Sequence, residues 1–241
     1  MAAGGDHLVS NRQFRMPAES GASDVASESQ VSFFPHGGNI YSPTTGQRIL
    51  RFALASDGYL DLSSLAVSMD LAVGPNGTAT PLVAGGHSLF SRMRWTLSGT
   101  TVEDVEYFSV CSEMFHRLLP AEAKSNIELM AFGGNTIQPG ATKNIVMMPK
   151  VSGLCNQPLW VAASFLGSQG CILELHCADG DEIFRSGAGD NITYQLSNCR
   201  VLCDVYHISN ELANTYASHV LSGKPLIYSI KSLVNTQFQL Q

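Results

Sequence analysis

Apolar and polar residues alternate with a period of two along much of the chain after residue 47. The apolar members of the clearest runs are Leu50, Phe52 and Leu54; Leu60 and Leu62; Val67, Met69, Leu71 and Val73; and Met93, Trp95 and Leu97. Such alternation is typical of strands that bury one face. Asp57-Gly58 and the Gly-Pro-Asn-Gly segment at 74–77 separate the runs and are turn signals. The pattern therefore predicts half-buried strands joined by short turns.

Later runs predict further strands at 126–132, 143–149, 159–166, 171–177 and 192–207. Asp179-Gly180 separates 171–177 from a run at 181–185, which is the sequence signal of a β-hairpin. All the runs together make about eight to ten strands, enough for two packed antiparallel sheets. We therefore predict a mostly β fold, a jelly-roll sandwich, interrupted by two short helices.

The first helix is predicted to begin at Thr100 or Thr101, because Glu103 and Asp104 follow at capping-box spacing. Apolar or small residues then recur at helical spacing before Pro120, namely Val105, Phe108, Cys111 or Ser112, Phe115 and Leu118. This spacing places Phe115 on the core-facing side. The second helix is predicted from the cap residue Ser209 to Gly223, with Leu212, Tyr216 and Val220 on one face.

The change of pattern along the chain predicts three parts. Residues 1–47 form an arm that is rich in Gly, Ser, Ala and Asn and is either disordered or extended on another surface. Residues 48–207 form the jelly-roll domain. Residues 208–241 form a helix and a connecting strand that leads toward a possible second jelly roll.

Charge is the unusual feature of the composition. Of the 241 residues, 44% are hydrophobic and only 14% are charged, against about 25% charged in ordinary proteins. A surface poor in charge suits a protein that buries its outside against neighbours. The net charge of -6 disfavours specific nucleic-acid binding. The uncharged stretch 151–173 includes Asn156, Gln157 and Pro158, so no membrane span is predicted.

Candidate chemistry is sparse. Gly86-His87-Ser88 has Phe90 where a nucleophile elbow needs glycine, and Cys111 and His116 point about 140° apart on a helix. Cys199, Cys203 and His207 would spread over roughly 26 Å of strand, too far for one zinc ion. Gly187 and Gly189 lack a phosphate-binding frame, and the acids at 179–182 lack a calcium-loop pattern. We predict no catalytic, cofactor-binding or metal-binding residues, no cofactor, and no enzyme activity.

Three segments resemble the major capsid proteins of virophages, Polinton-like viruses and nucleocytoplasmic large DNA viruses. Residues 48–62, with Tyr-Leu-Asp-Leu at 59–62, look like the strands that open the first of two jelly rolls in that family. Residues 89–95, followed by the acidic segment 99–107, are similar to a strand, turn and helix there. Residues 198–227, with Gly-Lys-Pro at 223–225, are similar to the segment that leaves the first jelly roll. The resemblance covers about residues 48–230 of the chain.

The resemblance implies a structural capsid subunit located in the virion and made in the host cell. The start of the sequence has no basic region followed by an apolar run, so no signal peptide is predicted. The resemblance also implies self-assembly into homotrimers and contacts with other capsid proteins. Family members carry two jelly rolls, whereas this chain has strands for one. It is therefore either the amino-terminal half of a longer protein or a single-barrel relative. The alternatives are a jelly-roll module that binds carbohydrate or another ligand, which clustered exposed aromatic side chains would favour, and a cupin-like enzyme, which the missing His-x-His pair disfavours.

Overall fold

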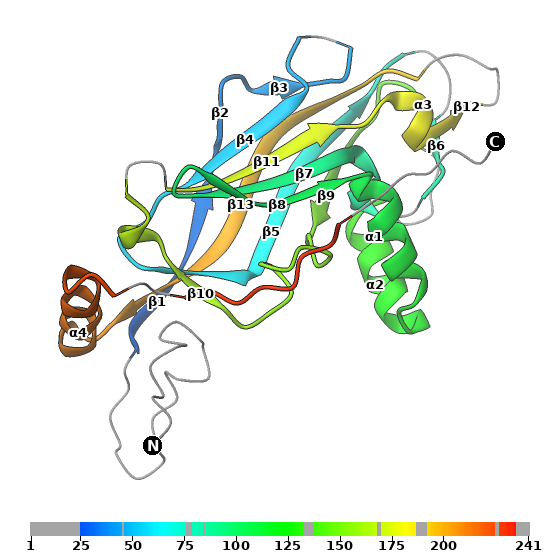
Figure 1. Ribbon diagram of the computed structural model, residues 1–241. Helices are drawn as coiled ribbons and strands as arrows, with labels where there is room; N and C mark the ends of the chain where they lie inside the picture. The colour runs from blue at the N-terminus through cyan, green and yellow to red at the C-terminus, as the bar shows by residue number, and fades with distance from the viewer. Residues whose placement is uncertain are drawn as a thin grey trace, which may run out of the picture.

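The computed structural model describes residues 25–44, 46–75, 79–83, 85–132, 137–167, 170–186, 192–224 and 227–234. Two antiparallel sheets face each other, a small third sheet lies at one end, and helices lie at the periphery (Figure 1). This arrangement confirms the predicted mostly β jelly-roll sandwich.

The larger sheet has the order β1-β13-β5-β10, with β9 also paired to β5 and β3 also paired to β13. Its strands are β1 (Val25–Phe33), β3 (Ile40–Tyr41), β5 (Tyr59–Val73), β9 (Thr142–Met147), β10 (Trp160–Ala162) and β13 (Tyr194–Ile208). The facing sheet has the order β2-β4-β11-β7-β8. Its strands are β2 (Pro35–His36), β4 (Ile49–Leu54), β11 (Cys171–Cys177), β7 (Phe90–Leu97) and β8 (Thr100–Glu106). The small sheet pairs β6 (Ala79–Pro81) with β12 (Phe184–Ser186).

The core lies between the two large sheets, where the period-two alternation directs the apolar side chains. Phe52 of β4 and Trp95 of β7 are fully buried on one side, and Val67 and Met69 of β5 are fully buried on the other. Sheets packed face to face interdigitate their inner side chains in this way. Complete burial of one such large apolar side chain stabilises the fold by about 1.5–3 kcal/mol.

The described residues of the range 1–47, which the sequence predicts to be an arm, include three strands. β1 runs antiparallel to β13 along its whole length, and the shorter β2 and β3 pair with β4 and β13. These three strands are thus part of the sandwich. The predicted domain boundaries at 47 and 207 remain predictions.

The first helix begins later than predicted. Residues 100–106 form β8, and α1 spans Phe108–Arg117. Ser98 and Gly99 both have positive φ, 50° and 80°, the backbone of a tight hairpin turn that folds β8 against β7. Of the two acids at capping-box spacing, Asp104 stabilises the hairpin, because it accepts hydrogen bonds from Arg92 and Arg94 on β7.

A helix, α2 (Ala121–Met130), replaces the strand predicted at 126–132. It follows Pro120, and its first turn contains Ala, Glu and Lys, which are strong helix formers. The predicted core face of α1 is confirmed at Phe108 and Ser112 and wrong at Phe115 and Leu118. The buried residues of α1 are Phe108, Ser112 and His116, whereas Phe115 is 49% exposed.

The remaining predicted elements divide into confirmed and incorrect ones. The second helix is confirmed as α4 (Asn210–Leu221), with Ser209 at its N-cap and Gly223 at a φ of 78° after its end. The hairpin at Asp179-Gly180 is wrong, since α3 (Gly180–Ile183) follows Asp179 and β12 pairs with β6. The run 159–166 divides into β10 and a short 3-10 helix, η2 (Ala163–Phe165).

A buried carboxylate ties the end of the described chain to the sandwich. Glu103 of β8 is 2% exposed. It accepts hydrogen bonds from Ser152 Oγ at 2.6 Å, from the Gly153 amide at 2.9 Å and from Ser232 Oγ at 3.3 Å. Gly153 also lies so close to the Lys231 backbone that a Cβ there would collide with it. Residues 227–234 are thereby held against the loop after β9.

We predict that Phe108→Ala lowers the free energy of unfolding by about 3–5 kcal/mol, because a fully buried aromatic ring leaves a cavity. Phe115→Ala on the same helix should cost only about 1 kcal/mol, since half of that side chain already contacts solvent. Urea denaturation of both variants measures the difference. Equal losses of unfolding free energy in the two variants would show that Phe115 is buried in the core, as its spacing predicted.

We also predict that Glu103→Ala lowers the free energy of unfolding by about 2–4 kcal/mol, because it leaves the Ser152 hydroxyl and the Gly153 amide unsatisfied. Glu106→Ala, on the same strand but exposed, is the matched control and should cost at most about 1 kcal/mol. Limited proteolysis should cut near residue 231 faster in the Glu103 variant alone. Unchanged cleavage would show that Glu103 does not hold this segment.

Candidate functional site

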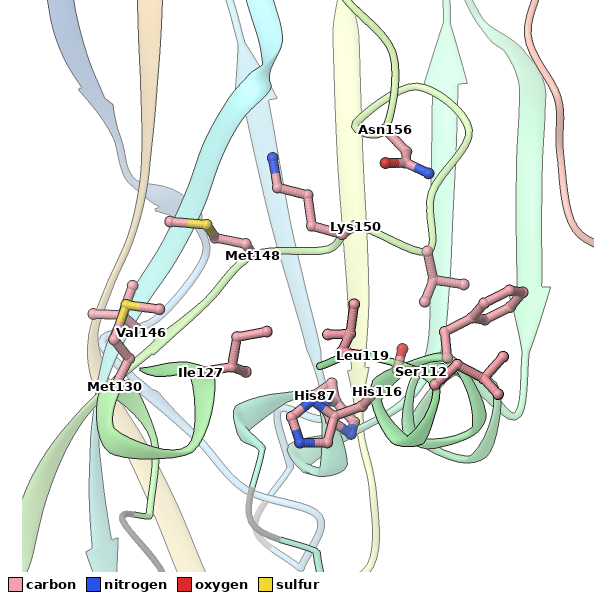
Figure 2. A pocket seen from close by; sticks show the side chains of 13 residues that line it. His87, Ser112, His116, Leu119, Ile127, Met130, Val146, Met148, Lys150 and Asn156 are labelled. Atoms are coloured by element: carbon pink, nitrogen blue, oxygen red, sulfur yellow. The ribbon is translucent and has the colours of Figure 1, made fainter. Parts of the chain in front are cut away.

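A largely apolar hollow lies between α1, α2, β9 and the loop after β9. Its volume is about 460 Å³. Figure 2 shows side chains from both helices and from this loop around it. The apolar residues of its wall include Leu119, Ile127, Met130, Val146, Met148 and Val151. Largely apolar clefts of this size accept apolar ligands or protruding side chains.

Exposed apolar side chains continue from the hollow along α1. Leu118 is 81% exposed and Met114 is 64% exposed, and Val110 lies one turn before Met114 on the same stripe. Phe115 and Leu118 belong both to this stripe and to the wall of the hollow. We call Val110, Met114, Phe115 and Leu118, with the hollow beside them, the helical apolar surface. Contiguous apolar surface of this kind usually marks an interaction site.

Two histidine–glutamate pairs lie beneath this surface. His116 of α1 has its Nε2 at 3.2 Å from Glu128 Oε1 of α2. His87, in the short 3-10 helix η1 (Gly86–Leu89), has its Nε2 at 3.4 Å from Glu113 Oε2 of α1, although the two are not aligned as a hydrogen bond. The imidazole centroids are 5.8 Å apart. The pairs therefore connect η1, α1 and α2.

Burial lowers the pKa of His87, and the nearby Glu113 carboxylate opposes that shift. Neutral imidazole is thus the form that the folded protein favours. The neighbouring Ser88 hydroxyl donates to the Gly85 carbonyl at 3.0 Å. The Gly-His-Ser segment is consequently a short helical turn that supports α1.

The outer face of the β4-β11-β7-β8 sheet carries a ladder of ion pairs. Glu174 of β11 lies 3.5 Å from Arg51 and 3.6 Å from Arg94. Asp104 of β8 contacts Arg94 at 3.2 Å and Arg92 at 2.7 Å. Hydrogen bonds from Arg92 are the main cause of the lowered pKa of Asp104. This face is polar and partly solvated, in contrast to the helical apolar surface.

A second, polar hollow of about 580 Å³ lies on the larger sheet. Asp70 accepts hydrogen bonds from Asn144 at 2.8 Å and from Asn198 at 2.6 Å, and these bonds lower its pKa. Phe34, 67% exposed, is the one aromatic residue among the described residues that line it. The clustered aromatic side chains that would favour a carbohydrate-binding module are not gathered here.

The residues considered as metal ligands are separated. Cys199 and Cys203 are buried on β13, and burial raises the pKa of each thiol to about 12. His207 is partly exposed and lies 3.9 Å from Asp57. Within the described ranges, no group of three or more His, Cys, Asp or Glu side chains could hold a metal ion. Gly187 and Gly189 lie outside the described residues.

The other candidate residues also have local partners. Asp179 pairs with Arg48 at 2.8 Å. His116 lies 3.2 Å from Glu128, so its partner is this carboxylate and not the Cys111 thiol. The helices in the described part of the chain are all too short or too polar to cross a bilayer.

Comparison with known proteins identifies the fold. No family model matches the chain, and no curated protein matches it in sequence. Among solved structures, PBCV-1 VP54 fitted into a reconstruction of the virophage Sputnik has a TM-score of 0.58 at 12% identity, over 79% of this chain and 44% of that one. The Faustovirus major capsid protein has a TM-score of 0.53 at 8% identity, over 87% of this chain and 59% of that one. The PBCV-1 capsid gives 0.50 at 8% identity, over 79% and 44%.

These similarities confirm that the chain adopts the jelly-roll fold seen in viral major capsid proteins, as the sequence resemblance predicted. At such low identity the likeness concerns the fold. The chain spans about half the length of the solved structures that it matches.

We predict that acid weakens the junction of η1 and α1. The pKa of His87 is lower in the folded protein than in the unfolded chain, so the unfolded chain binds the proton more readily. The free energy of unfolding should therefore fall as the pH drops from about 7 toward 5. His87→Gln should flatten this dependence, whereas the exposed His36→Gln should preserve it. Chemical denaturation at a series of pH values checks the slope, and an unchanged slope in the His87 variant would contradict the prediction.

Proposed function

We propose that this chain is a subunit of a viral capsid, and more specifically the first jelly roll of a double-barrel major capsid protein. The carrying observation is the fold match to VP54 and to the Faustovirus protein, which covers most of this chain but only about half of theirs. A single sandwich that accounts for half of such a protein corresponds to one of two barrels.

The chemistry of the surface supports a structural role. Only 14% of the residues are charged, and a surface poor in charge loses less hydration when neighbouring subunits cover it. One sheet face offers a polar ladder around Glu174 and Asp104, while α1 offers apolar side chains. Different neighbours can therefore bind to chemically different faces of one subunit.

The proposal includes the arrangement expected from the resemblance. The subunit is not an enzyme and needs no cofactor. It assembles into trimers in the virion and contacts other capsid proteins, without specific recognition of nucleic acid. Residues 1–47 are proposed as the arm, 48–207 as the jelly roll, and 208–241 as the passage to a second jelly roll.

We predict that residues 1–241 expressed alone are poorly soluble or polydisperse. Unpaired edges such as β8 and the exposed apolar side chains of α1 promote association, and low charge provides little repulsion. The reading frame in the source transcript should continue after residue 241 into a second β-rich region. Light scattering of the short chain and sequencing of the transcript test both points.

The longer product should form discrete trimers, which sedimentation and electron microscopy detect. A stop codon directly after Gln241, together with a clean monomer in solution, would contradict the capsid proposal. A stop codon with discrete trimers would instead support a single-barrel capsid protein and remove only the second jelly roll from it.

A further inference from the structure

The helical apolar surface leaves several large apolar side chains of α1 in contact with solvent. Val110, Met114 and Leu118 are each more than half exposed and follow one another at one-turn spacing on α1. Phe115, beside them, is one of the residues that line the hollow of about 460 Å³. Covering apolar side chains is favourable by about 25 cal/mol per Å². A groove flanked by such side chains therefore fits a partner that supplies apolar side chains of its own.

The end of the described chain lies next to this groove. Val151 and Asn156, in the loop after β9, form part of its wall. The same loop holds residues 231 and 232 through the close approach of Gly153 to Lys231 and the shared hydrogen bonds of Glu103. Figure 1 shows the red segment passing from α4 across the sandwich toward α1. Residues 231 and 232 therefore contact the loop that forms one wall of the groove.

The charged outer face of the β4-β11-β7-β8 sheet is a less favourable binding surface for a partner that supplies apolar side chains. Covering the ladder of Arg92, Arg94, Asp104 and Glu174 would remove partly solvated ions from water, and that desolvation costs several kcal/mol per ion unless new partners replace the water. The helical apolar surface carries no such penalty. An intimate contact made within one polypeptide therefore favours the helices over the charged sheet face.

Resting on the proposed function, we infer that the helical apolar surface is the docking surface for the second jelly roll of the same polypeptide. The matching region covers only 44% of VP54 and 59% of the Faustovirus protein, so the remainder of such a chain provides a partner of the required size. Apolar side chains of that second barrel fill the hollow and cover Met114 and Leu118. The contact forms within one chain, so it does not depend on protein concentration.

Thiol labelling of the longer product tests this inference. Leu118→Cys is introduced together with Cys111→Ser, because Cys111 is the partly exposed native cysteine on α1. The other five cysteines are buried and react slowly with maleimide. Ser29→Cys in the same background is the control, because Ser29 is exposed on β1, on the opposite edge of the sheet from β9. Monomer and trimer fractions are labelled separately, and each rate is divided by the rate in denaturant.

We expect the thiol at position 118 to be at least about tenfold more protected than the thiol at position 29, already in the monomer fraction. Protection that appears only in trimers would assign the surface to a second copy and overturn the inference. A freely reactive thiol in both fractions would also overturn it, while trimers in that sample would leave the capsid proposal standing. A reading frame that stops at residue 241 would overturn the inference together with the double-barrel part of the proposal, and the oligomeric state of the chain would then test the capsid role separately.

Discussion

The antiparallel pairing of β5 with β13 is the interaction on which the rest of the structure depends. β5 pairs with β9 and β10 at different points along its length, and β13 pairs with β1 and β3. Two register shifts bend this long pair, one at Ser197/Arg200 and one at Leu202/Asp204. Ser64 stabilises the second shift, because its hydroxyl oxygen accepts a hydrogen bond from the Asp204 amide at 2.8 Å. The apolar side chains of this bent pair form one side of the core, and the shorter strands pair with its outer edges.

Local periodicity predicted this framework because strand burial leaves a direct trace in the sequence. β4, β5, β7, β11 and β13 all coincide with predicted runs. The errors occur where a distant partner decides the structure. Asp104 reads locally as part of a helix N-terminus, but Arg92 and Arg94 on the preceding strand hold it in a hairpin. Helical spacing on α1 likewise shows two stripes, and only the packed structure decides that Phe108 and His116 face inward and Phe115 outward.

The helical apolar surface could not be predicted from spacing, because segments far apart in the sequence build it. Beneath it, His87 of η1 lies against Glu113 of α1, and His116 of α1 lies against Glu128, in a segment predicted to be a strand. Histidine and glutamate at these intervals form no recognisable motif. Only the topology, which lays α1 on η1 and α2 beside β9, brings them together. The capsid resemblance, in contrast, rests on strands and turns that the sequence displays directly.

The side chains that α1 turns inward explain why its apolar stripe remains exposed. Phe108, Ser112 and His116 are the buried residues of α1, so Val110, Met114 and Leu118 lie on its outer side. His116 and Glu128 join α1 to α2 at 3.2 Å, and His87 lies 3.4 Å from Glu113 on α1. Burying these groups costs desolvation, which their mutual pairing offsets only while the helices keep their spacing. The pairs thereby connect α1 to its neighbours by its inner side, and the apolar stripe on its outer side remains exposed beside the barrel.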